Sequence, residues 1–318
     1  MCPGGGVGYS RVSCRISLRT DEKEKEENEM KLENDRLCVE IAEQGAEVTR
    51  IYDKKKDTEL LWNGDPAYWK RHSPILFPNV GKTYHNTVRI NGTQYPTSQH
   101  GFARDNRFKC VRETADTVSF LFSSTEETKE VYPFDFDLTV TYRLEGDELQ
   151  VKWAVQNTGE EEMCFTIGGH PAFCFEDAAD EKKDYILKFP GKTSLDYILI
   201  DLAELAADTG KVYRLELENE CCPLTEEMFE NDALIFDHGQ ISEVWLCRKD
   251  GTPRVGMRCE GFPNFGIWSV KNAPFVCLEP WMGRCDDIGF DRELSEKPNV
   301  NKVPAGGRFE QSYVISAG

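Results

Sequence analysis

Residues 137–155 read DLTVTYRLEGDELQVKWAV, and this stretch decides the fold class. Apolar side chains stand at every second position of its first half, namely Leu138, Val140, Tyr142 and Leu144. After a link at 145–147 the alternation resumes at Leu149, Val151, Trp153 and Val155. A period of two turns one face of a strand to the core and the other to solvent. The stretch therefore predicts a long antiparallel hairpin with one buried face.

The same alternation recurs along the chain. A second hairpin is predicted over Val244–Cys247 and Val255–Cys259, joined by Lys249-Asp250-Gly251. Shorter strands are expected around 39–41, 48–51 and 118–122, whereas helical spacing is confined to Thr225–Glu230, with Thr225 as N-cap, and Leu202–Ala207. Many strands with few short helices, and no alternation of strands with long helices, predict an all-β protein built as a large antiparallel β-sandwich.

Composition narrows the function. The 318 residues carry 38 Lys and Arg against 56 Asp and Glu, a net charge of −18 that would repel nucleic acid. No run approaches the roughly 18–20 apolar residues of a membrane span. The twelve cysteines are scattered without a CxxC pair or a zinc-like His/Cys cluster. We therefore expect free thiols, a cytoplasmic location, and no metal, nucleic-acid or membrane partner.

The chain divides near Met30. Residues 1–29 combine a Gly/Ser/Arg segment with an Asp/Glu/Lys run and show no apolar periodicity, so we expect a disordered leader. Residues 30–318 are expected to form a single β-sandwich catalytic domain.

Glu279 and His170 are the leading candidates for chemistry. Glu279 interrupts the apolar stretch 275–281, where a carboxylate must be paired or take a raised pKa that suits a general base. The alternative is a structural ion pair, with Arg284 as the partner. His170 follows Gly168-Gly169, which removes side-chain bulk so that a ligand can approach the backbone, and precedes a proline. The alternative is a histidine satisfied by backbone in a tight turn.

Other candidates are weaker on sequence alone. His100 lies in the polar segment Gln99–Asp105, which is either a ligand loop or a surface turn. Asp237 follows the predicted strand 234–236, where polar residues are common. Trp268 and Trp281 offer flat apolar faces on which a sugar can pack, although buried tryptophans more often belong to a core.

Four motifs, in this order, resemble the aldose 1-epimerase (galactose mutarotase-like) family: SPILFP at 73–78, QHGFAR at 99–104, GHPAF at 169–173 and EPW at 279–281. The resemblance covers about residues 30–316. The chain looks most like the bacterial branch found with lactose-operon genes, which is similar to hexose-6-phosphate 1-epimerases. The resemblance implies a supersandwich fold with a sugar bound in an open cleft on one sheet.

The family's roles carry over by motif. His170 matches the general acid, Glu279 the base, and His100 the histidine that contacts the anomeric or ring oxygen. The resemblance assigns substrate contacts to Gln99, Arg104, Arg71 and Asp237, and Trp268 is added as a sugar-packing face. Lys82 stands where relatives often carry Arg, and a lysine cannot offer a bidentate fork.

The resemblance therefore implies a cofactor-independent isomerase that exchanges the α and β anomers of a hexose by ring opening and closure. Hexose-6-phosphate 1-epimerase activity and a non-catalytic sugar-binding module are the alternatives, and an accessory domain of a glycoside hydrolase is a third. The partner expected is a monosaccharide or a sugar phosphate, and the protein is expected to be a monomer or a weak homodimer.

Overall fold

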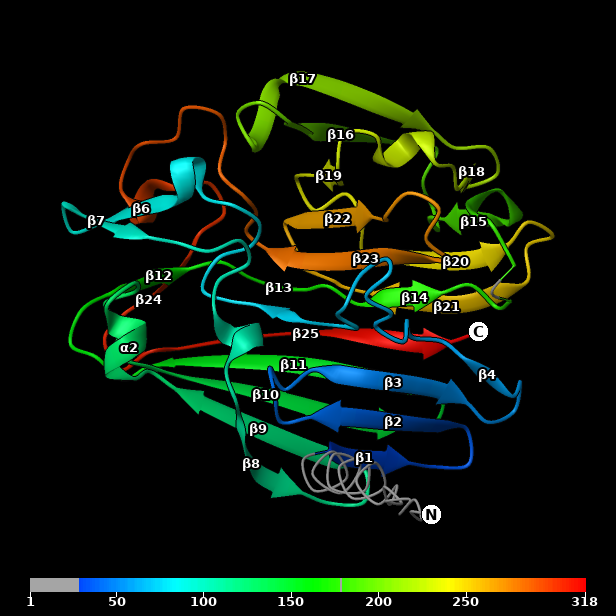
Figure 1. Cartoon of the computed structure of the whole chain (residues 1–318), viewed down its shortest axis with the longest axis horizontal. Helices are drawn as coiled ribbons and strands as arrows, with labels where there is room; N and C mark the ends of the chain where they lie inside the picture. Colours follow the sequence, from blue (N-terminus) through cyan, green and yellow to red (C-terminus); the bar gives the residue numbers. More distant parts are fainter. Residues whose placement is uncertain (1–28, 178) are drawn as a thin grey trace, which may run out of the picture.

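The computed structural model describes residues 29–177 and 179–318, and its largest layer is a nine-stranded antiparallel sheet (Figure 1). In spatial order its strands are β18 (Cys221–Pro223), β15 (Tyr185–Lys188), β20 (Glu243–Arg248), β21 (Pro253–Arg258), β25 (Arg308–Ala317), β11 (Glu148–Asn157), β10 (Phe136–Glu145), β9 (Thr117–Ser123) and β8 (Lys109–Glu113). The C-terminal strand β25 thus lies in the middle of this sheet.

An eight-stranded sheet carries the candidate site residues. Its order is β17 (Ala206–Glu216), β16 (Ser194–Asp201), β19 (Leu234–Phe236), β22 (Asn264–Trp268), β23 (Phe275–Met282), β13 (Ile167–Gly169) and β5 (Ile75–Leu76), and β14 (Ala172–Cys174) also pairs with β23. Strand β23 pairs with three strands, namely β13, β14 and β22, so it is a central strand of this sheet.

Smaller elements complete the chain. A four-stranded sheet comprises β1 (Glu29–Glu33), β2 (Leu37–Ala42), β3 (Val48–Asp53) and β4 (Thr58–Glu59). Two-stranded sheets pair β12 (Met163–Phe165) with β24 (Asn301–Val303), and β6 (Thr87–Ile90) with β7 (Thr93–Pro96). The helical elements are α2 (Glu126–Lys129) and 3₁₀ turns at Tyr84–Asn86, Ala103–Asp105, Lys182–Asp184, Glu227–Phe229 and Leu294–Glu296.

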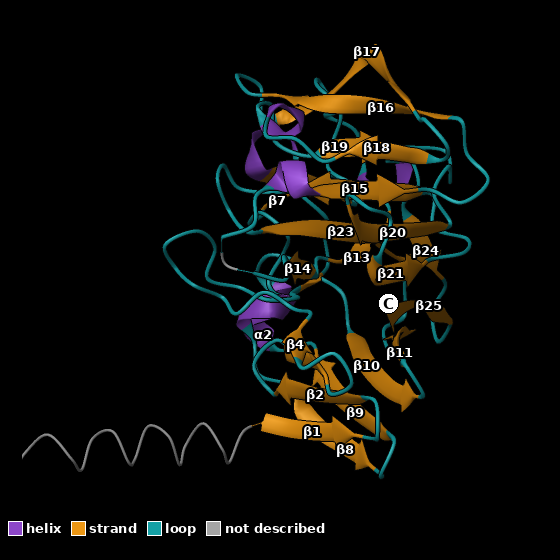
Figure 2. Ribbon diagram, turned by 90° about the vertical axis from the view of Figure 1, so that its right-hand side faces the viewer, coloured by secondary structure: helices purple, strands orange, loops and turns teal. Residues whose placement is uncertain are grey.

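The main core lies between the layers. Its buried side chains come from the nine-stranded sheet, such as Leu138 and Tyr313, from the eight-stranded sheet, such as Leu278, and from the four-stranded sheet, such as Ile41. Figure 2 shows the strands stacked across the molecule, with only short helical segments among the loops. The predicted antiparallel β-sandwich with few short helices is confirmed.

The hairpin from which the fold was predicted is present in full. β10 and β11 pair from Phe136 with Asn157 to Glu145 with Glu148, so the link is only Gly146-Asp147. Gly146 takes φ +60°, a left-handed conformation that glycine adopts without strain. The hairpin over β20 and β21 and the shorter predicted strands are also present.

The two predicted helices are wrong. Residues 202–205 form a turn between β16 and β17, in which the Asp201 carboxylate accepts hydrogen bonds from the backbone N–H groups of Ala203 and Glu204. In the segment 225–230 only a 3₁₀ turn forms, at Glu227–Phe229, and its N-cap is Glu226 rather than Thr225. Short polar segments offer the backbone such side-chain partners, which compete with helix formation.

The predicted leader, residues 1–29, falls outside the described residues except for Glu29, which already begins β1. No helix in the described parts of the chain is long and apolar enough to cross a membrane.

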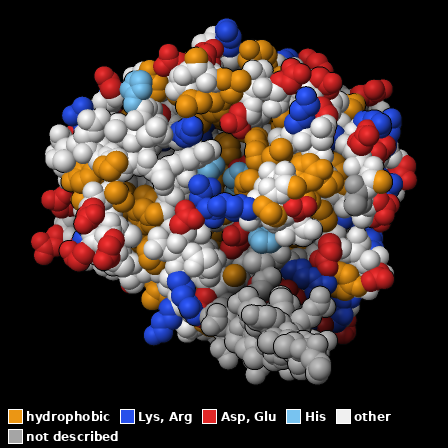
Figure 3. Space-filling view, in the orientation of Figure 1, with side chains coloured by type: hydrophobic (Ala, Val, Ile, Leu, Met, Phe, Trp, Pro, Cys, Tyr) orange, Lys and Arg blue, Asp and Glu red, His pale blue; other side chains and the backbone are white. Residues whose placement is uncertain are grey.

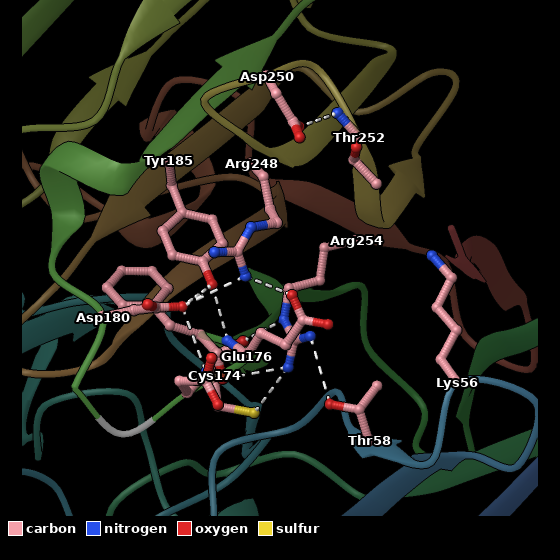
Figure 4. A network of polar contacts seen from close by, with 12 residues as sticks. Lys56, Thr58, Cys174, Glu176, Asp180, Tyr185, Arg248, Asp250, Thr252 and Arg254 are labelled. Atoms are coloured by element: carbon pink, nitrogen blue, oxygen red, sulfur yellow. Dashed lines mark hydrogen bonds and ion pairs between the residues drawn. The ribbon is translucent and has the colours of Figure 1, made fainter.

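A buried arginine anchors the strand that follows the His170 motif (Figure 4). Arg254 of β21 donates to the backbone carbonyls of Cys174 at 2.7 Å and Phe175 at 3.1 Å, at the end of β14. It also donates to the carbonyl of Glu59 in β4 at 2.5 Å. The Arg254 guanidinium therefore links β14 to the nine-stranded sheet, which carries Arg254, and to the four-stranded sheet, which carries Glu59. These contacts fix the strand that follows His170.

Candidate active site

The period of two along β23 places Glu279 on the face that looks away from the main core. Val276 and Leu278 pack in that core, while Phe275, Cys277 and Trp281 belong to two small clusters on the opposite face. Glu279 alternates with the latter set and is 1% exposed. The strand's apolar residues thus secure it in the sheet, and its one carboxylate is left to face the other side.

His170 meets Glu279 from the neighbouring segment. It lies between β13 and β14, and its Nε2 is 3.3 Å from Glu279 Oε2. The alignment is not that of a hydrogen bond, so within the described residues Oε2 has no hydrogen-bond partner. Trp69 stacks on the imidazole with ring centroids 4.7 Å apart, and Trp268 packs edge-on at 5.6 Å.

Gly168 and Gly169 were predicted to let a ligand approach the backbone, but the structure places side chains of the protein against them. A Cβ at Gly168 would lie 2.5 Å from Cδ1 of Trp281, and one at Gly169 would lie 2.6 Å from the hydroxyl of Tyr313. The glycines therefore make room for two aromatic side chains of the protein, one on each face of β13, rather than for a ligand at the backbone.

His100 is held with one tautomer selected. It adopts φ +67°, and its Nδ1 accepts a hydrogen bond from the backbone N–H of Gly81 at 3.1 Å. A neutral imidazole that accepts at Nδ1 carries its proton on Nε2, where it is a donor. The ring lies 5.4 Å from that of His170, measured between centroids. The surface-turn alternative is wrong, because His100 is 9% exposed.

Two arginines lie beside the histidines. Arg71 donates to the carboxylate of Asp105 at 2.7 Å, and Arg104 donates to the backbone carbonyl of Gln99 at 2.6 Å. Burial first, and then the proximity of Arg71, lowers the pKa of Arg104 to about 10. The segment that carries Arg71 is fixed by Glu47, whose carboxylate accepts from the backbone N–H groups of residues 72 and 73.

Burial controls the charge of the catalytic candidates. It lowers the pKa of His170 to about 3 and raises the pKa of Glu279 well above its ordinary range, and the nearby Asp232 raises the latter further. Burial, with nearby cationic groups, also lowers the pKa of His100 well below its usual range. These shifts favour the proton on the carboxyl group of the His170–Glu279 pair and the neutral form of both histidines.

The predicted site residues line one cavity of about 580 Å³, with Asp237 as the exception. Those that line it are Arg71, Gln99, His100, Arg104, His170, Trp268 and Glu279, joined by Lys82 and Trp281. Figure 3 shows this face hollowed near its middle, where histidine side chains lie beside Lys and Arg side chains. Trp69 and Asp232 also line the cavity and were missed from the sequence, although Trp69 stands in a stretch rich in aromatic and polar residues.

Asp237 is a correction. Its carboxylate accepts from Arg284 Nε at 2.9 Å and from the amide of Asn264 at 2.6 Å, and it is absent from the cavity lining. Arg284, the partner suggested for Glu279 in the ion-pair alternative, instead pairs with Asp237 and Asp287. Arg284 therefore accounts for both corrections. It binds Asp237 away from the cavity, and it does not pair with Glu279, which lines the cavity.

Known proteins resemble this chain in both sequence and fold. A family model described as Aldose 1-epimerase matches residues 28–283. Protein LacX (plasmid form) of Lactococcus lactis subsp. lactis is 29% identical over 300 residues, 90% of this chain and 98% of that protein. A galactose mutarotase related enzyme from Lactobacillus acidophilus is 30% identical with a TM-score of 0.85 over 91% of this chain and 97% of its own. A galactose mutarotase-like protein from Lactobacillus casei is 30% identical with a TM-score of 0.84, over 91% of this chain and 100% of its own.

Proposed function

Because the chain belongs to the aldose 1-epimerase family, we propose that it exchanges the α and β anomers of a hexose in the cavity that Glu279 and His170 line. One observation carries the proposal. A carboxyl group and an imidazole, 1% and 6% exposed, stand 3.3 Å apart and share a wall of a cavity large enough for a monosaccharide.

The reaction needs one proton removed and one delivered. Glu279 takes the proton of the C1 hydroxyl while His170 gives a proton to the ring oxygen, so the C1–ring-oxygen bond breaks and the aldehyde forms. Rotation about C1–C2 turns the other face of the carbonyl, and closure returns both protons. The roles reverse on closure by microscopic reversibility, and each group is expected to contribute about 10²–10⁴-fold.

The resting charge state fits the middle of this cycle. With the proton on Glu279 and neutral His170, the form that the pKa shifts favour, the pair has the charge state that follows ring opening. Binding of a cyclic sugar must therefore move the proton from Glu279 to His170, across a separation of 3.3 Å. Hydrogen bonds from the sugar hydroxyls to the carboxylate favour its charged form and supply the driving force.

The remaining lining residues suit a bound sugar. His100 Nε2–H supplies a donor for the ring or anomeric oxygen, since Nδ1 is occupied by the Gly81 N–H. Trp69 and Trp268 offer apolar faces for sugar C–H groups. Asp232 takes the role predicted for Asp237, that of a carboxylate which accepts hydrogen bonds from the sugar hydroxyls.

A sugar phosphate is the second candidate substrate, and the arginines favour it. Arg71 and Arg104 lie together with Asp105 as their one carboxylate partner, and Arg104 Nε is buried without a hydrogen-bond partner among the described residues. Two crowded guanidinium groups beside a cavity favour an anionic group on the ligand.

A polarimetric assay tests the proposal. Catalytic amounts of the protein should accelerate anomer exchange of glucose or galactose, or of their 6-phosphates, above the spontaneous rate. A folded protein that accelerates none of them would contradict the proposal.

Arg104→Met decides between the substrate classes. If Arg104 binds phosphate, the variant should lose at least about tenfold in kcat/KM for the 6-phosphate, since charge-assisted bonds are the strong ones, and far less for the free sugar. Equal losses favour hydroxyl binding. Arg107→Met is the matched control, because Arg107 pairs with Glu43 and does not line the cavity.

A further inference from the structure

A cysteine stands directly behind the acid–base pair. Cys277 precedes Glu279 by two residues on β23, so both side chains leave the same face of the strand. One ligand atom each of His170, Cys277 and Glu279 lies within 4.8 Å of the other two, and all three residues are buried. Among the described residues this is the group of side chains that could hold a metal ion.

The donor set and its spacing match a thiophilic divalent cation. Zinc is bound by cysteine, histidine and carboxylate at about 2.0–2.3 Å, which at tetrahedral angles separates the ligand atoms by roughly 3.3–3.6 Å. His170 Nε2 and Glu279 Oε2 already stand 3.3 Å apart. The Cys277 sulfur lies within 4.8 Å of both atoms. Cys277 pairs with Ala172 of β14, two residues after His170, so the two side chains come from neighbouring hydrogen-bonded segments.

The surroundings favour binding in two further respects. Glu279 Oε2 is buried and has no hydrogen-bond partner among the described residues, so a cation would satisfy it. One thiolate, one carboxylate and a neutral imidazole balance the charge of a dication, as a buried site requires. The cavity gives access from the side of His170 and Glu279 and leaves the fourth position open.

We infer that His170, Cys277 and Glu279 form a site for Zn²⁺ or a similar thiophilic cation, which blocks anomer exchange when it is occupied. Binding releases the proton of the Cys277 thiol and the one held by the His170–Glu279 pair, and both catalytic groups become metal ligands. The site rests on the geometry, and only the inhibition rests on the proposed function.

Direct binding tests the site. Titration of the whole chain with Zn²⁺ against a chromophoric chelator should show one cation bound tightly, and Mg²⁺, which prefers oxygen ligands, should not compete. Cys277→Ala should weaken Zn²⁺ binding by at least about tenfold, since even changes outside the ligand shell cost about 10–100-fold. Cys285→Ala is the matched control, because Cys285 lines the cavity outside the cluster, and its Zn²⁺ affinity should match that of the unaltered chain.

Equal Zn²⁺ affinity in Cys277→Ala and the unaltered chain would overturn the inference. Should Cys277→Ala fail to fold, the Co²⁺ complex of the unaltered chain decides, because a bound thiolate gives a charge-transfer band and its absence excludes Cys277 as a ligand. Zn²⁺ should also inhibit anomer exchange competitively with the sugar. Tight binding without inhibition would support the metal site and contradict the proposed acid–base pair instead.

Discussion

At the scale of single residues, the burial of Glu279 and His170 lowers the stability of the fold, because it disfavours their charged forms. Burial raises the pKa of Glu279 well above the ordinary value of 4.5, which favours the protonated carboxyl group in the folded state. In the unfolded chain it ionises above that value, so the wild-type fold loses stability as the pH rises from 4.5 toward the folded pKa. The carboxyl group is therefore retained for a reason other than stability.

Glu279→Gln removes this cost while keeping the volume of the side chain. The variant should melt at a higher temperature than the wild type, and the gain should increase between pH 5 and pH 8. Melting curves recorded by circular dichroism check this. A structural ion-pair role predicts the reverse, a variant that melts lower at every pH.

His170 should show the opposite pH trend. Burial lowers its pKa to about 3, so the wild-type fold loses stability as the pH falls from 6.5 toward 3, where the unfolded chain gains a proton that the fold refuses. The melting temperature of His170→Asn relative to the wild type should therefore rise as the pH is lowered from 7 to 5. A difference that does not change over that range would show that His170 is not held neutral.

Asp232 and Asp237 should separate binding from stability. Asp232→Asn should lower kcat/KM with little change in melting temperature, because its carboxylate faces the cavity. Asp237→Asn should cost about 1–3 kcal/mol of unfolding free energy and spare kcat/KM, because it weakens the partner of a buried arginine. Kinetics and urea unfolding of the two variants check this, and an exchange of the two outcomes would restore the original assignment of Asp237.

At the scale of elements, β22 and β23 hold the site through a glycine and a tryptophan. Gly266 is paired with Glu279 across the two strands, and the ring of Trp281 lies over it. A Cβ at Gly266 would come within 2.3 Å of that ring, so the indole must move away from the floor of the cavity. The position of the tryptophan beside Glu279 therefore depends on the absence of one methyl group.

Gly266→Ala should reduce both stability and activity. We expect a loss of about 1–3 kcal/mol from overpacking and a fall in kcat/KM of the folded enzyme. Gly256→Ala is the matched control. Its Cβ would come within 2.6 Å of the indole of Trp245, and both residues belong to the nine-stranded sheet, away from the site. The control should lose stability and keep its kcat/KM. Equal kcat/KM in both variants would mean that Trp281 takes no part in the site.

Strands were predictable from the sequence where one face is buried, and helices were not. The alternation in 137–155 reports burial directly, and β10 and β11 follow it residue by residue. Leu202–Ala207 has helix-forming residues, but the Asp201 side chain and the pairing of β16 with β17 determine its conformation. Local propensity is a weak signal when a tight connection between paired strands competes with it.

At the scale of the whole molecule, the site is an assembly that no single segment reveals. His100, His170 and Glu279 come from three distant segments and were placed by their motifs. The sugar-binding carboxylate was predicted at Asp237 instead of Asp232, because the two residues lie on either side of the same short strand, β19. The two residues stand near opposite ends of that strand, and only Asp232 lines the cavity. Likewise, His170 and Cys277 are too far apart in sequence for the metal-ligand cluster to be predicted.

The most direct test of the central claim is the rate of anomer exchange in Glu279→Gln, His170→Asn and the double variant, each confirmed to be folded. If the two groups handle one proton as a unit, each single variant loses at least about 10²-fold in kcat, and the double variant loses little more than the worse single one. Either single variant retaining wild-type kcat, or losses that simply multiply in the double variant, would contradict this account.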